Sequence, residues 1–61
     1  MHEFEIIEKV GISNNSYSDA VKNALKNTKK KIFWFEIVEQ RGRVKNNDEI
    51  EFQVVIKIGC D

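Results

Sequence analysis

The sequence predicts an α+β domain whose elements follow in the order β-α-β-β. A stripe of apolar residues with helical period lies within residues 16–30. Segments rich in β-branched and aromatic residues lie before and after it. The last two of these segments are joined by a polar, turn-rich connection, which predicts an antiparallel hairpin. We therefore expect a three-stranded antiparallel sheet wrapped on one helix, which can cover only one side of that sheet.

The first strand and the helix are predicted from their end signals. The strand is expected at residues 3–10 and is followed by the turn-like sequence of residues 11–15. The helix is expected at residues 16–30, with Ser16 capping its first turn and Asp19 in the place of the usual capping-box glutamate. Lysines at the end of this segment suit the negative end of the helix dipole.

The second and third strands are expected at residues 32–40 and 50–59, with a turn at 41–49 between them. Because side chains alternate along a strand, each strand has two sides. The apolar sides are expected to pack under the helix, and they carry Phe33, Phe35, Ile37, Phe52, Val54, Ile56 and Ile58, together with Phe4, Ile6 and Val10 of the first strand. The opposite side of the sheet, which we call the outward face, is expected to carry Ile7, Trp34, Glu36, Val38, Gln40, Gln53, Val55 and Lys57.

Composition excludes several classes of function. The 10 Lys and Arg residues balance 10 Asp and Glu residues, which argues against nucleic acid or an anionic membrane as the main partner. The single cysteine, Cys60, excludes an intramolecular disulfide and a cysteine-based zinc site. The sequence contains neither an apolar run of membrane-spanning length nor a signal peptide. We expect one cytoplasmic domain over residues 1–61.

Catalytic and metal sites are not expected. No Ser/His/Asp, Cys/His or paired-carboxylate arrangement supports an enzyme. The only histidine, His2, has no partner at metal-ligand spacing. The hairpin glutamates are expected to form cross-strand ion pairs with Arg41, Arg43 or Lys57.

Trp34 is the most informative residue because it is expected on the side of the sheet away from the only helix. A tryptophan side chain there exposes about 200 Å² of mostly apolar surface. At about 25 cal/mol per Å², leaving it in water forfeits several kcal/mol. A chain this short gains only about 3–5 kcal/mol from one core and commonly needs support from oligomerisation. Either another subunit or a flat aromatic ligand should cover the indole, and a symmetric interface allows both.

Six segments together resemble the dodecin family of small flavin-binding proteins. They span nearly the whole chain in the family's order and comprise residues 10–13, 16–21, 34–37, 39–42, 52–54 and 57–59. The resemblance implies a hollow homo-dodecamer built from the β-α-β-β fold. It also implies that two flavins stack as an antiparallel pair between symmetry-related Trp34 side chains at a subunit interface. Gln53 matches the glutamine whose amide binds the polar edge of the isoalloxazine.

The implied function is storage and sequestration of FMN or riboflavin, with Trp34 quenching the excited flavin by electron donation. Arg41 is a candidate for the phosphate of FMN or of coenzyme A, and it is equally interpreted as a solvated arginine. An oligomer without flavin, which binds another ligand such as coenzyme A or has a structural role, is the alternative. The connection between helix and second strand is shorter than in the family, so the last helical turn is expected to be lost or re-routed.

Overall fold

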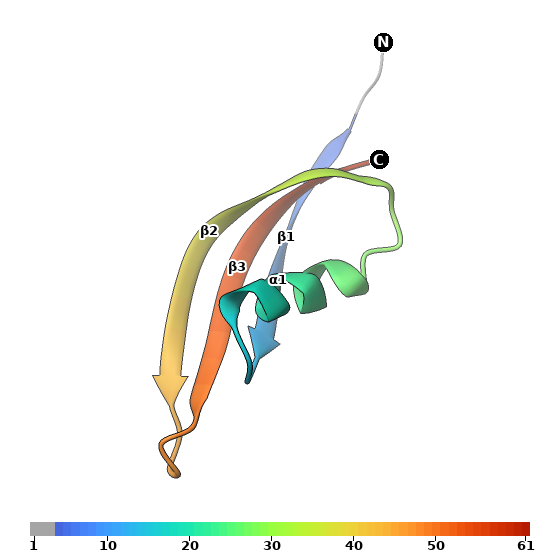
Figure 1. Cartoon of the computed structure of the whole chain (residues 1–61). Helices are drawn as coiled ribbons and strands as arrows, with labels where there is room; N and C mark the ends of the chain where they lie inside the picture. The colour runs from blue at the N-terminus through green and yellow to red at the C-terminus, as the bar shows by residue number, and fades with distance from the viewer. Residues whose placement is uncertain (1–3) are drawn as a thin grey trace.

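The computed structural model describes residues 4–61, so His2 and Glu3 lie outside the described residues. Its elements are β1 (Glu5–Ser13), α1 (Tyr17–Lys26), β2 (Ile32–Val44) and β3 (Ile50–Cys60). All strand pairs are antiparallel, and β3 lies between β1 and β2. The helix packs against one side of this curved sheet (Figure 1). The predicted β-α-β-β order and the three-stranded antiparallel sheet are confirmed.

The start of α1 follows the capping prediction, but its end does not. Ser16 Oγ accepts a hydrogen bond of 3.0 Å from the backbone N–H of Asp19. The carboxylate of Asp19 accepts a hydrogen bond of 2.7 Å from the hydroxyl of Ser13, and the backbone N–H of Ser16, to which a capping-box glutamate would bond, donates to Ser13 Oγ at 3.5 Å. The helix ends at Lys26, and Asn27 caps it. Its predicted last turn is lost, as the short connection implied.

The turn predicted at residue 11 is wrong, because β1 continues to Ser13. Gly11 lies opposite Val54 inside the sheet. A Cβ atom on Gly11 would lie 2.0 Å from the carbonyl oxygen of Ala20 and 2.8 Å from the Cβ of Ala24. This glycine therefore allows α1 to pack closely on β1, and it does not end the strand.

The two sides of β1 are the reverse of those predicted. Ile7 pairs with Ile58 and packs against the core, so it lies on the helix side. Ile6 pairs with Gly59, and Val10 pairs with Val55, which places both on the outward face with Phe4. Apolar residues occur at both parities in this segment, so alternation alone did not decide between the sides, whereas pairing with β3 does.

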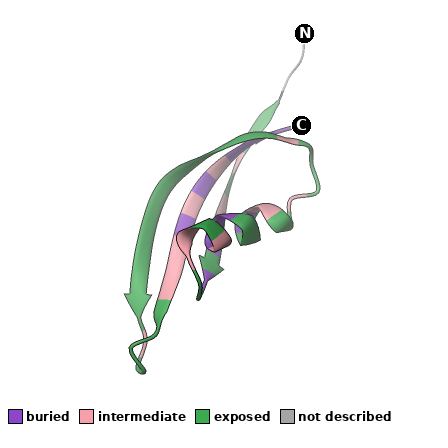
Figure 2. Cartoon of the chain, viewed as in Figure 1, coloured by how far each residue is buried: buried purple, intermediate pink, exposed green. Residues whose placement is uncertain are grey.

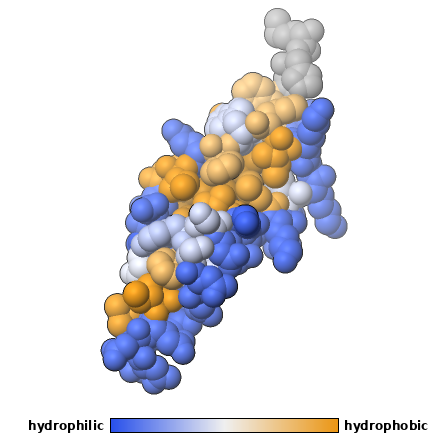
Figure 3. Space-filling view, in the orientation of Figure 1, coloured by the Kyte–Doolittle hydropathy of each residue, from blue (hydrophilic) through white to orange (hydrophobic). Residues whose placement is uncertain are grey.

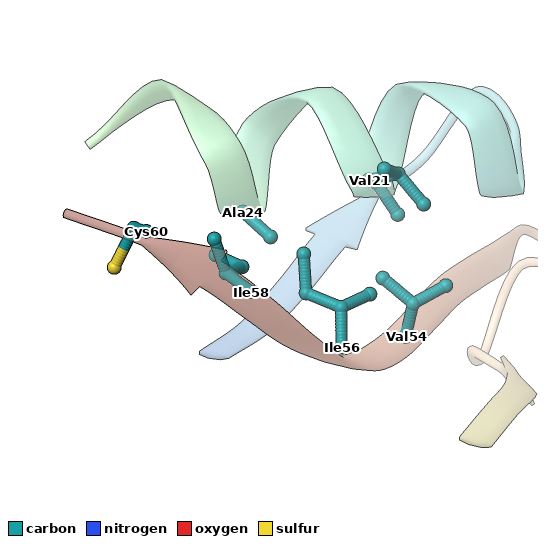
Figure 4. Close-up of a cluster of buried hydrophobic side chains, with 7 residues drawn as sticks. Val21, Ala24, Val54, Ile56, Ile58 and Cys60 are labelled. Carbon is teal, nitrogen blue, oxygen red and sulfur yellow. The ribbon is translucent and has the colours of Figure 1, made fainter. Parts of the chain in front are cut away.

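The helix covers β1 and β3 but leaves β2 open, as Figure 2 shows. Phe35 and Ile37 lie opposite Ile58 and Ile56 on the helix side, yet they remain 46% and 43% exposed. The prediction that they pack under the helix is therefore wrong, and Phe33 falls at a bulge between Ile32 and Trp34. Figure 4 shows β3 side chains meeting those of α1; the buried core comprises Ala20, Val21, Ala24, Val54, Ile56, Ile58 and Cys60.

The far half of β2 also departs from the prediction. The strand runs on to Val44, so the turn is confined to residues 45–49. A second irregularity between Ile37 and Glu39 shifts the alternation by one residue. Gln40 therefore lies on the helix side and not on the outward face, while Arg41 faces outward opposite Gln53. In the described part of the chain, no helix has the length and apolar character needed to span a membrane.

Candidate functional site

Two rows of side chains cross the outward face. The Trp34 row consists of Ile6, Gly59 and Trp34, which are paired neighbours on β1, β3 and β2. The Gln53 row consists of Ile12, Gln53 and Arg41 on the same three strands. The register confirms that Trp34 and Gln53 lie on the same side of the sheet, away from the helix.

The indole of Trp34 lies over β3. Its Cε2, Nε1 and Cζ2 atoms are 2.2, 2.3 and 2.7 Å from the position that a Cβ atom on Gly59 would occupy. The ring of Phe4 meets the indole edge to face, with 6.3 Å between centroids and 83° between planes. Trp34 is nevertheless 39% exposed. The chain places this ring in a defined position and does not cover it.

The amide of Gln53 is oriented by an acidic neighbour. Its Nε2 donates a hydrogen bond of 2.8 Å to Glu51 Oε1. Within residues 4–61 the amide makes no other hydrogen bond, so its oxygen and its second N–H remain available to a ligand. Arg41 lies directly across from Gln53 and forms an ion pair with Glu39.

Electrostatics keep Glu51 ionised. The hydrogen bond from Gln53 is the main cause that lowers the pKa of the Glu51 carboxyl below its usual value. Arg43 at 3.5 Å and Lys45 at 3.4 Å lower this pKa further. A carboxylate only accepts hydrogen bonds, so it selects the nitrogen end of the Gln53 amide. The Arg43–Glu51 contact is a cross-strand ion pair of the predicted kind, whereas Arg41 pairs along its own strand.

The two rows are far apart in one chain. Gly59 is six positions beyond Gln53 on β3, which corresponds to about 20 Å at about 3.3 Å per residue. One three-ring ligand does not span that distance. At this separation of the two rows along β3, we expect a flavin that contacts both an indole and an amide of this kind to take them from two different chains.

A second apolar surface lies on the helix side of the sheet. The uncovered part of β2 and the flank of α1 enclose a groove of about 390 Å³, lined by Tyr17, Ser18, Val21, Lys22, Leu25, Phe35 and Ile37. Figure 3 shows apolar side chains gathered over the middle of this face, with hydrophilic ones at its margins. Sequence reasoning missed this groove because it assumed that one helix covers all three strands.

Potential metal ligands are scattered. Among residues 4–61, no group of three or more His, Cys, Asp and Glu side chains is arranged to hold a metal ion. The thiol of Cys60 is free and fully buried at the end of β3. In the described part of the chain, the candidate site therefore consists of the indole of Trp34, the amide of Gln53 and the guanidinium of Arg41.

Comparison with solved structures gives close matches in fold. A dodecin from Streptomyces davaonensis is 29% identical, with a TM-score of 0.85 over 97% of this chain and 91% of that one. A dodecin from Streptomyces coelicolor is 32% identical, with a TM-score of 0.83 over 97% and 89%. A calcium-chelating dodecin from Mycobacterium tuberculosis shares the fold at 18% identity, with a TM-score of 0.82 over 95% and 87%.

The search of curated proteins finds no match. The family model for dodecins, which are binding proteins and not enzymes, matches residues 4–61. The sequence analysis likewise predicted that this chain is not an enzyme. Because the family model spans every described residue, and solved dodecins superpose on almost the whole chain, this chain belongs to the dodecin family.

Proposed function

We propose that this chain stores FMN or riboflavin and shields it from photochemistry. Two flavins stack as an antiparallel pair between the Trp34 side chains of two symmetry-related subunits of a hollow homo-dodecamer. The observation that carries the proposal is the indole itself, which lies 39% exposed on the outward face and is held by Phe4 and Gly59. A flat heteroaromatic ring would cover the surface that the chain leaves open.

Assembly is supported by the two apolar surfaces. Membership of the family implies a homo-oligomer. The outward face and the groove beside α1 lie on opposite sides of the sheet, so one two-fold contact covers only one of them. Covering both surfaces requires two different kinds of subunit contact. Subunits joined by two kinds of contact form an assembly larger than a dimer, and it is a closed oligomer when the contacts follow a closed point-group symmetry. This supports a closed oligomer such as the dodecamer.

The chemistry of the two rows fits a flavin. Stacking of an aromatic side chain on a heteroaromatic ring contributes about 1–3 kcal/mol, by analogy with nucleic-acid bases. The free oxygen and N–H of Gln53 match the alternating donors and acceptors of the uracil-like edge of isoalloxazine. Because the Trp34 row and the Gln53 row of one chain are about 20 Å apart along β3, each flavin contacts Trp34 of one subunit and Gln53 of another. Arg41, beside Gln53, is the candidate for the phosphate of FMN or coenzyme A.

Titration with FMN tests this proposal. The parent protein should quench FMN fluorescence, and Trp34→Ala should lose both the binding and the quenching. Trp34→Phe is the matched control, since it keeps an aromatic surface but is a weaker electron donor. It should retain part of the affinity with less quenching.

Equal FMN affinity in the parent and in Trp34→Ala would refute stacking on the indole. An assembled parent protein that leaves FMN fluorescence unchanged would refute flavin storage. That result would favour an oligomer that binds another ligand, such as coenzyme A, or has a structural role.

A further inference from the structure

Gly59 occupies a special position beneath the indole. It is buried in the central strand β3, with Ile6 on one side and Trp34 on the other. Three atoms along one edge of the indole lie within 2.2–2.7 Å of the place where a Cβ atom would project from Gly59. Separations under 3.0 Å are essentially never seen for real Cβ atoms, so any side chain at this position would collide with the ring.

The contact with Phe4 shows how far the indole reaches. Adjacent strands are about 4.8 Å apart, so β1 and β2 lie about 9.6 Å apart on either side of β3. Trp34 is on β2 and Phe4 directly precedes β1, yet their ring centroids are 6.3 Å apart. The indole therefore extends across β3, through the space above Gly59, to meet the ring of Phe4.

We propose that Gly59 is a positioning residue for the ligand that stacks on Trp34, with Phe4 fixing the far edge of the indole. This inference rests on the proposed function. Because Gly59 has no side chain, there is space above the backbone of the central strand, and the indole lies in that space. Phe4 then restrains the ring in one orientation before any ligand arrives, which reduces the entropy lost on binding.

Replacement of Gly59 by alanine should move the ring and not the strand. The backbone of β3 is hydrogen-bonded to a strand on each side, whereas the indole is open to solvent on its outer surface. The Cβ atom of Gly59→Ala would therefore displace the indole from β3 and from Phe4. We expect FMN affinity to fall about tenfold, as a good part of the stacking is lost.

Gly42→Ala provides a matched control. A Cβ atom on Gly42 would make only ordinary contacts, at 3.5 Å to Tyr17 Oη and 3.7 Å to Ile50 Cγ2. Trp34 is the only tryptophan, so its emission without ligand reports the position of this one ring. Emission, near-ultraviolet circular dichroism and FMN affinity should change in Gly59→Ala and stay at parent values in Gly42→Ala.

Phe4→Ala keeps the proposal testable if Gly59→Ala does not fold, because it leaves β3 unchanged. It should alter Trp34 emission and weaken FMN binding by a few fold. Parent-like emission and FMN affinity in folded Gly59→Ala, or in Phe4→Ala if the glycine variant is unfolded, would overturn the proposal. If Trp34→Ala abolishes FMN binding while Gly59→Ala preserves it, the positioning role fails and the proposed function stands. If Trp34→Ala itself binds FMN normally, the proposed function fails.

Discussion

The two sides of β3 differ in how much the chain itself supplies to cover them. On the helix side, Val54, Ile56 and Ile58 are fully buried against α1. On the outward side, Gln53, Val55 and Lys57 alternate with them and are only half-buried. The neighbouring apolar residues of the outward face are about half exposed. One side is completed within the chain, so it holds the fold. The other side is left open by the chain, and under the proposed function it contacts a partner subunit and the ligand.

Ile56→Ala should give the largest effect, because it opens a cavity on the completed side. Loss of a buried isoleucine to alanine lowers the free energy of unfolding by about 2–5 kcal/mol. Urea unfolding followed by circular dichroism measures this change. Val55→Ala on the same strand is the control, and it should act mainly by weakening subunit contacts, so its effect should decrease at high protein concentration. If both variants lost the same free energy of unfolding at every protein concentration, the two sides of β3 would not differ in the way proposed.

Mixed oligomers test whether residues of two different chains together form the binding site on the outward side. Trp34→Ala and Gln53→Ala subunits, unfolded and reassembled together, should regain a fraction of sites with the FMN affinity of the parent, which neither variant has alone, because some interfaces then combine an intact Trp34 with an intact Gln53. The control is each variant reassembled by itself. No recovery in mixed oligomers of normal size would contradict a site shared between chains.

Gln53→Met should have a smaller effect than loss of the indole. Methionine keeps the length of the side chain but removes the amide, and a neutral hydrogen bond contributes about 0.5–1.5 kcal/mol. FMN affinity should fall by about tenfold or less, while the bound flavin remains quenched because Trp34 is intact. Isothermal titration calorimetry combined with fluorescence separates these two properties. Loss of quenching at saturation would show that the amide, and not the indole alone, controls the excited state.

Arg41→Ala tests the phosphate contact. The guanidinium pairs with Glu39 at an exposed position, and exposed ion pairs contribute about 0–1 kcal/mol. If Arg41 binds the phosphate, FMN affinity should fall by a few fold at low salt while riboflavin affinity stays constant. Equal affinities of the variant and the parent for FMN would assign Arg41 to the solvated ion pair with Glu39.

Acidification should weaken the cap of α1. Hydrogen bonds from Ser13 and then Asn15 lower the pKa of Asp19 in the folded chain. A carboxyl whose folded pKa is depressed contributes stability above its unfolded pKa and loses it as the pH falls through the folded pKa. Thermal unfolding between about pH 5 and pH 2 should show this loss in the parent and less of it in Asp19→Asn. An identical pH dependence in the two proteins would refute the assignment.

Element types and the placement of Trp34 were predictable because they depend on local patterns. Alternation along two apolar strands placed Trp34 and Gln53 on one face, and pairing with β3 confirms this. The predicted side of the sheet was wrong for residues whose orientation depends on pairing with another strand. The irregularity after Ile37 shifts the parity of Gln40 and Arg41, and no turn residue marks it in the sequence.

The role of the glycines was also beyond prediction from sequence. Gly11 was predicted to lie in a turn, but a glycine is needed there because α1 packs so closely that a side chain would collide with it. Gly59 lies in the third strand as predicted, but the sequence did not show that it lies beneath an indole that reaches from β2. Both positions depend on tertiary contacts that single-sequence patterns do not encode.

The most direct measurement is a titration of the size-fractionated oligomer with FMN, in which flavin emission and Trp34 emission are recorded together. Trp34 is the only tryptophan, so its emission reports contact at this one site. We expect both signals to decrease in parallel and to saturate at the same ratio of FMN to subunit. Bound FMN that stays fluorescent, or quenching of FMN with no change in the tryptophan signal, would contradict stacking on the indole.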